Sequence, residues 1–108
     1  MSEDLQKVKT LLKVRGCSGR TVTTYISCIN RFKNYFEGKD LENFNEEDIL
    51  EYIKVNFVDL DYSPASINVN RAAIKYYYLV NLKKDLMIHY YHTVKFIEDI
   101  HIYLIQGM

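Results

Sequence analysis

Apolar residues recur along the first 84 positions with the three- and four-residue spacing of amphipathic helices. Each of four such segments follows a residue whose side-chain oxygen can accept a hydrogen bond from a first-turn amide. These capping residues are Ser2, Ser18, Asn45 and Ser63. The pattern predicts one helix that ends at Gly16, a second over about residues 19–37, a third from residue 46 and a fourth that starts at Pro64. No alternating run before residue 85 indicates a strand, so an all-α bundle of four to five helices is expected.

Two of the predicted helices carry a polar face opposite the face that is expected to pack. In the second helix the packing face is Val22, Tyr25, Ile26, Ile29, Phe32 and Phe36, and the polar stripe is Arg20, Thr24, Ser27, Arg31 and Asn34. In the fourth helix the packing face is Ile67, Ile74, Tyr77 and Tyr78, and the other face is Asn68, Arg71, Ala72 and Lys75. Neither polar face contains Asp or Glu, so each is expected to be polar, basic and free of acid.

The formal net charge is zero, but the charges are segregated along the chain. Residues 5–36 hold seven Lys and Arg residues and no Asp or Glu, whereas residues 37–61 hold nine Asp and Glu residues and two Lys. Residues 62–84 again carry only Lys and Arg among their charged side chains. The folded chain can therefore present separate positive and negative faces, and the positive one favours a nucleic-acid partner.

Length and composition fit one domain with a core, since 48% of the 108 residues are hydrophobic. No apolar run is long enough for a membrane span and the N-terminus lacks signal-peptide features, so a cytoplasmic protein is expected. Cys17 and Cys28 lack CxxC spacing and are expected to be small buried hydrophobes. His89, His92 and His101 do not define a zinc site, so neither a metal nor a cofactor is expected.

Residues 85–108 form a separate apolar segment after a first unit of residues 1–84. Its apolar residues Leu86, Tyr90, Val94, Ile97 and Leu104 can share one helical face, although residues 100–105 also have strand-like composition. We expect a helix because the preceding segments are helical. Its apolar residues lie on all sides of the expected helix, so more than one face must be buried, either against the bundle or against a second copy of the chain.

Three stretches of the sequence resemble, in the same order, three sequence motifs of one protein family. Residues 16–21 with Tyr25 resemble the motif G-x-S-x-x-T-x-x-x-Y, and residues 41–52, LENFNEEDILEY, resemble L-x-x-L-T-x-x-D-I-x-x-Y/F. Residues 63–78 resemble S-P-x-T-I-N-x-x-L-S-A-L-R-x-F-Y. Over residues 5–84 the chain is thus similar to the N-terminal SAM-like, or core-binding, domain of the tyrosine recombinases, the phage integrases.

The resemblance implies a module that clamps duplex DNA while a separate catalytic domain cuts and rejoins strands. In this family the second and fourth helices carry most of the DNA contacts, and these are the helices with acid-free faces here. The expected DNA-binding residues are Arg20, Thr21, Thr24, Ser27, Arg31, Asn34, Asn68, Arg71 and Lys75. The chain shows no catalytic Arg, Lys, His-x-x-Arg and Tyr constellation, because His89 to His92 lacks the arginine. No catalysis is therefore expected from it, and a recombinase catalytic domain is an implied partner.

A second interpretation is a protein–protein interaction module or a stand-alone regulator derived from an integrase. In that case residues 86–105 form a dimer interface. The three consecutive tyrosines, Tyr76 to Tyr78, fit a base-stacking platform, but at helical spacing they are more typical of core and rim positions.

Overall fold

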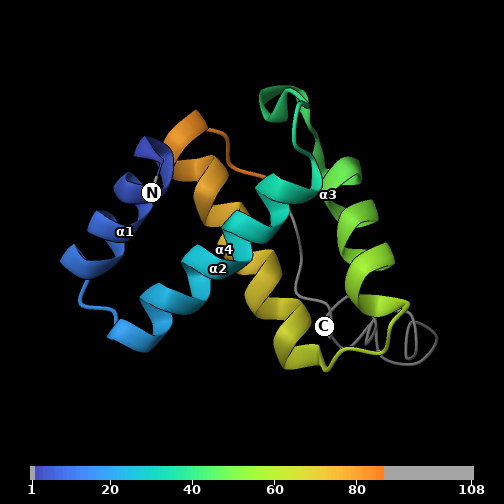
Figure 1. Ribbon diagram of the computed structural model, residues 1–108, viewed down its shortest axis with the longest axis horizontal. Helices are drawn as coiled ribbons and strands as arrows, with labels where there is room; N and C mark the ends of the chain where they lie inside the picture. Colours follow the sequence, from blue (N-terminus) through green and yellow to red (C-terminus); the bar gives the residue numbers. More distant parts are fainter. Residues whose placement is uncertain (1, 87–108) are drawn as a thin grey trace, which may run out of the picture.

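The computed structural model describes residues 2–86, which form four α-helices and no strand (Figure 1). The helices are α1 (Glu3–Val14), α2 (Gly19–Tyr35), α3 (Glu46–Ile53) and α4 (Pro64–Leu82), with a short 3-10 helix η1 (Leu41–Asn43) and a π-helix η2 (Lys54–Val58) that continues α3. No helix of this part is long and apolar enough to cross a membrane. The all-α expectation is confirmed for these residues. The segment 85–108, for which a helix is expected, lies outside the described residues except for positions 85 and 86, and so do the three histidines.

Three helix starts form as the capping residues predict. The Oγ atom of Ser18 accepts a hydrogen bond from the amide of Thr21 at 3.2 Å, and Ser63 does the same for Ser66 at 3.2 Å. At α3, Asn45 and Asp48 exchange reciprocal side-chain to backbone hydrogen bonds of 3.0 and 2.9 Å, a capping box. Local chemistry therefore sets these boundaries before any tertiary contact is considered.

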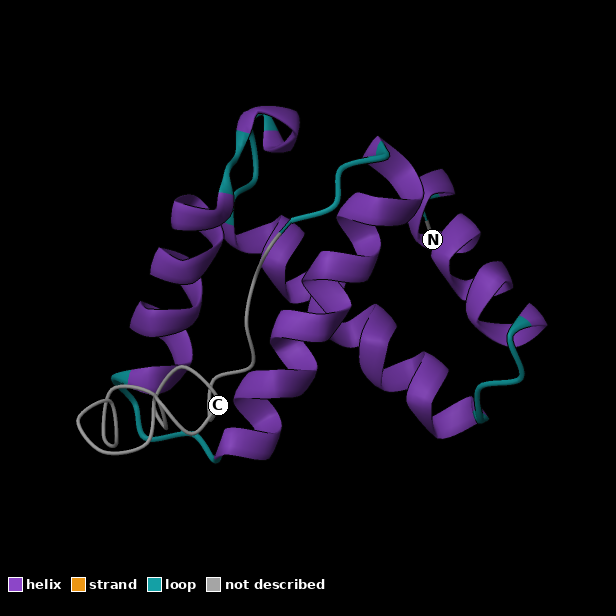
Figure 2. Ribbon diagram, turned by 180° about the vertical axis from the view of Figure 1, so that it is seen from behind, coloured by secondary structure: helices purple, strands orange, loops and turns teal. Residues whose placement is uncertain are grey.

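Helices α2 and α4 cross at the centre of the fold (Figures 1 and 2). Helix α1 packs against both of them, and α3 with η2 lies on the other side of the crossing. Fully buried side chains from every α-helix and η2 meet in one core, which includes Val8, Ile29, Phe32, Ile49, Phe57, Ile74 and Tyr78. Because α4 contacts α1, α2, α3 and η2, little of its surface stays free.

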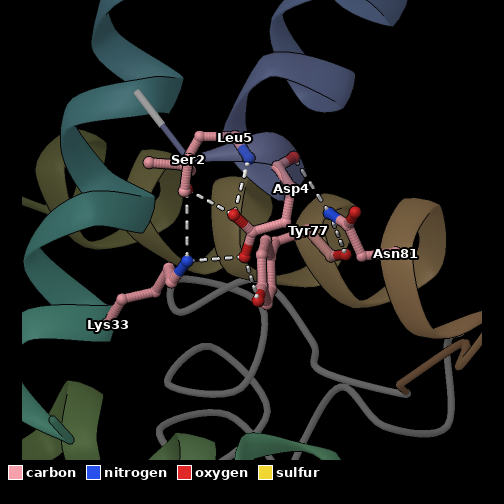
Figure 3. Close-up of polar contacts among 6 residues, drawn as sticks. All are labelled: Ser2, Asp4, Leu5, Lys33, Tyr77 and Asn81. Carbon is pink, nitrogen blue, oxygen red and sulfur yellow. Dashed lines mark hydrogen bonds and ion pairs between the residues drawn. The ribbon is translucent and has the colours of Figure 1, made fainter.

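The start of α1 is attached to α2 and α4 by polar contacts around Asp4 (Figure 3). Lys33 of α2 and the hydroxyl of Tyr77 of α4 both donate to the Oδ2 atom of Asp4, and the hydroxyl of Tyr77 lies 2.8 Å away. The side-chain amide of Asn81 donates to the carbonyl oxygen of Asp4 at 3.3 Å. A single acidic residue thus connects three helices.

The segment before α3 is held by the end of α4. The hydroxyl of Tyr78 donates to the carbonyl oxygen of Leu41 at 2.8 Å. Lys83 ends α4 in the left-handed conformation, with φ 52°, and the chain then places Lys84 next to the same segment. The ammonium group of Lys84 donates to the carbonyl oxygens of Glu42 at 2.9 Å and Phe44 at 2.5 Å.

Both cysteines are free thiols in this fold. Cys28 is buried in the core, as expected from the sequence. Cys17 is half-buried and packs against the core. Burial raises the pKa of the Cys28 thiol, while the nearby charge of Arg31 acts in the opposite direction. The net effect keeps Cys28 protonated at neutral pH, consistent with a packing role.

Candidate nucleic-acid interface

The polar stripe of α2 lies on the surface of the fold. Arg20, Ser27, Arg31 and Asn34 are exposed and Thr24 is half-buried, whereas Val22, Ile29 and Phe32 on the opposite side belong to the core. Helix α2 contains no Asp or Glu along its whole length. Its outer face therefore offers cations and neutral hydrogen-bonding groups with no opposing acid on the same helix.

Thr21, another expected contact, lies half-buried at the start of this helix. Its hydroxyl accepts a hydrogen bond from the Ser18 hydroxyl at 3.1 Å, and its amide donates to the same Ser18 oxygen. Thr21 is thus part of the helix cap, and the open stripe begins with Arg20.

Arg31, in the middle of the stripe, stacks on aromatic rings from outside α2. Its guanidinium carbon lies 4.7 Å from the ring centre of Phe57 and 5.8 Å from that of Tyr62. The phenol of Tyr52 is also near: burial raises its pKa to about 12, and the Arg31 charge opposes that rise. Arg31 itself remains exposed, so the rings support the guanidinium without enclosing it.

Arg71, which the sequence places on the basic face of α4, is buried in the structure. Only 5% of Arg71 is exposed, because α4 lies at the centre of the bundle rather than at its edge. Lys75 is half-buried and its ammonium group lies 4.0 Å from a carboxylate oxygen of Asp85, so it is not an unopposed cation either. Asn68 is half-buried as well. The structure therefore leaves α2, and not α4, with an open polar face.

The packing face of α4 agrees with the sequence prediction. Ile67, Ile74, Tyr77 and Tyr78 are all buried. Tyr76 is half-buried and its ring meets that of Tyr25 edge-to-face, with the ring centres 6.3 Å apart. These tyrosines therefore act mainly as packing residues and do not form an open stacking platform.

Two contacts of the basic region could not be read from helical spacing. The guanidinium carbon of Arg15, at the end of α1, lies 5.6 Å from the ring centre of Tyr76 on α4. Phe57 and Tyr62, which support Arg31, lie in η2 and in the corner that joins η2 to α4. Helical spacing relates residues of one helix only, so it does not predict contacts between residues of different elements.

The opposite charge gathers on a different part of the fold. The acidic residues Glu42, Glu47, Asp48 and Glu51 are exposed on η1 and α3. Helix α1, with Lys7, Lys9 and Lys13, lies away from α3 in Figure 1. The C-terminal end of α2 instead packs against α3, where the ring centres of Phe32 and Tyr52 are 5.1 Å apart. The acidic residues of η1 and α3 thus lie apart from α1, while α2, which has no acid of its own, reaches α3 with its C-terminal end.

The fold and these capped helices define an all-α SAM-like bundle. A family model described as phage integrase, N-terminal SAM-like domain, matches residues 5–88. The chain therefore belongs to the family of phage integrase N-terminal SAM-like domains, within the tyrosine recombinases, and the resemblance noted over residues 5–84 is confirmed. A comparison with curated proteins found no match, and a comparison with solved structures also found none.

Proposed function

We propose that the protein is a DNA-binding module of a tyrosine recombinase, which clamps duplex DNA with the outer face of α2 and has no catalytic residues of its own. The observation that carries this proposal is the acid-free stripe on α2, whose cations Arg20 and Arg31 are both exposed. Family membership supports it independently. Its partners are then duplex DNA and the catalytic domain of a recombinase.

The dimensions of the stripe suit a phosphate backbone. From Arg20 to Asn34 the helix rises by about 21 Å, which equals roughly six base-pair steps of a DNA strand. Arg20 and Arg31 would neutralise phosphates and release counterions, while Ser27 and Asn34 would donate hydrogen bonds to phosphate oxygens or base edges. Most of these contacts position the duplex and give little sequence discrimination.

In this proposal α4 has a supporting role. Its half-buried Asn68 and Lys75 lie on the helix that packs directly beneath α2, and they add contacts at the edge of the interface. Buried Arg71 contributes to the fold instead. The α2 stripe is thus expected to dominate affinity.

Binding of the full chain to a short mixed-sequence duplex, measured by fluorescence anisotropy at two salt concentrations, tests the proposal. Arg20→Glu is the most informative variant because Arg20 is exposed in the first turn of α2, where a carboxylate is favourable to the helix. We expect its affinity to fall by about tenfold or more and the salt slope to decrease by about one. Lys39→Glu is the matched control, since it makes the same charge change at an exposed position after α2.

Two results would contradict the proposal. One is a wild-type chain that fails to bind the duplex at low salt. The other is an equal loss of affinity in Arg20→Glu and Lys39→Glu, which would mean that net charge and not the α2 face governs binding. In the first case sedimentation analysis would test the alternative of an interaction module.

A further inference from the structure

The guanidinium of Arg31 rests on an aromatic shelf formed by Phe57 and Tyr62. The guanidinium carbon lies 4.7 Å from one ring centre and 5.8 Å from the other, and the two rings meet edge-to-face with centres 5.0 Å apart. A guanidinium that stacks on an aromatic face keeps the N–H donors along its edge available. Arg31 is therefore oriented without losing its hydrogen-bonding capacity.

Backbone geometry and core packing both fix this shelf. Phe57 is fully buried and its ring also packs against Tyr52, with centres 5.7 Å apart. The amide of Tyr62 donates to the carbonyl oxygen of Phe57 at 3.0 Å, which folds the chain back so that the two rings adjoin. Asp61, in the left-handed region with φ 59°, makes this reversal possible. The shelf is thus part of the fold and not a chance contact of two surface side chains.

Charges near the shelf leave Arg31 available to an anion. In the η2–α4 corner, Asp59 is paired with Lys54, with 3.0 Å between the ammonium nitrogen and a carboxylate oxygen. Within residues 2–86, Arg31 takes part in no ion pair. Aromatic rings therefore hold the guanidinium, and no described carboxylate occupies its donors.

We propose that Phe57 and Tyr62 are positioning residues that hold Arg31 ready for a phosphate of duplex DNA. This inference rests on the proposed function. A long side chain loses conformational freedom when it binds, and the shelf removes part of that entropy loss in advance. A phosphate accepts two parallel hydrogen bonds from the edge of a guanidinium, so the stacked face and the binding edge do not compete.

Tyr62 is the residue to change, because it is 38% exposed whereas a change at Phe57 would disturb the core. In the full chain, Tyr62→Leu is expected to weaken binding to the mixed-sequence duplex by about threefold to tenfold. The salt slope should stay the same, since the number of phosphate contacts is unchanged. Tyr62→Phe keeps the ring and should bind as tightly as the wild-type chain.

A double-mutant cycle separates positioning from direct contact. Tyr62→Leu should have no further effect in the Arg31→Ala background but its full effect in the Arg20→Ala background. The same loss with and without Arg31 would overturn the inference, because Tyr62 would then act on the DNA or on the fold directly.

Arg31→Lys gives a second measurement that leaves the shelf intact. Lysine keeps the charge but lacks the planar group that stacks, so we expect a loss similar to that of Tyr62→Leu. Wild-type affinity in Arg31→Lys would overturn the inference while leaving the proposed function standing. A wild-type chain that does not bind the duplex would instead overturn the proposed function itself.

Discussion

The ammonium nitrogen of Lys33 on α2 lies 2.5 Å from the Oδ2 atom of Asp4, which lies in the first turn of α1. Both side chains are about three-quarters buried, and the hydroxyl of Tyr77 donates to the same oxygen. Burial alone would raise the pKa of Asp4, but hydrogen bonds from Lys33, Ser2 and Tyr77 outweigh it and hold the pKa well below its usual range. The ionised carboxylate therefore contributes to stability.

This contact makes the stability of the fold dependent on pH in the acidic range. Because the folded-state pKa of Asp4 lies below the unfolded value, its contribution is complete above the unfolded pKa, about 4, and declines as the pH falls below that value. Asp4→Asn should lower the free energy of unfolding by about 1–3 kcal/mol at pH 7. Urea unfolding from neutral to acidic pH should show that this difference shrinks below about pH 4.

Glu3→Gln is the control for this measurement. Glu3 is an exposed acid in the same first turn, so its replacement loses only the favourable interaction with the helix dipole, about 0.3–1 kcal/mol. If both variants lost the same free energy with the same pH dependence, the dipole and not the contact with Lys33 would be the source.

The corner between α1 and α2 depends on one glycine conformation. Gly16 has φ 86°, a region that side chains with a Cβ atom rarely adopt, although no atom lies close enough to clash with one. Gly16→Ala is therefore expected to destabilise the fold by about 1 kcal/mol through backbone strain alone. Gly19→Ala is the matched control, because Gly19 is the first helical residue of α2 with equal space around it, and we expect it to be neutral or slightly stabilising. Thermal unfolding of the two variants measures the difference.

Removal of two buried tyrosine hydroxyls should change the free energy of unfolding differently. The hydroxyl of Tyr78 donates to Leu41, whereas that of Tyr52 is buried with no hydrogen-bond partner among the described residues. Tyr78→Phe leaves a carbonyl without its donor and should cost about 1 kcal/mol. Tyr52→Phe removes an unsatisfied polar atom and should be neutral or stabilising. Chemical denaturation compares the two, and an equal loss in both would contradict the hydrogen-bond assignment.

Local features of the fold could be predicted from the sequence because their causes lie within a few residues. The caps at Ser18, Asn45 and Ser63 each depend on a partner three positions away. Helix α2 shows a sharp contrast between its apolar and polar faces, so its exposed stripe could be identified in advance.

The remaining features depend on contacts that sequence spacing does not encode. Asp4 and Lys33 are 29 positions apart in the sequence. Arg31 contacts Phe57 and Tyr62 only because the fold brings α2 next to the corner between η2 and α4. For α4 the spacing predicts a polar, basic face, but this helix lies at the centre of the bundle and Arg71 on that face is buried. Whether a polar face meets solvent or another helix is decided by tertiary packing.

Because Arg71 is buried, the same charge reversal should affect stability when it is made on α4 and DNA affinity when it is made on α2. Arg71→Glu places a negative charge in a site that is 5% exposed, so we expect it to lower the free energy of unfolding by about 3–5 kcal/mol. Arg20→Glu makes the same charge change at an exposed position and should leave thermal stability unchanged or slightly higher while DNA affinity falls. Circular dichroism melting, combined with anisotropy measured below each melting temperature, distinguishes the effects. A stably folded Arg71→Glu chain with lost DNA binding would instead place Arg71 in the interface and give α4 more than a supporting role in the proposed clamp.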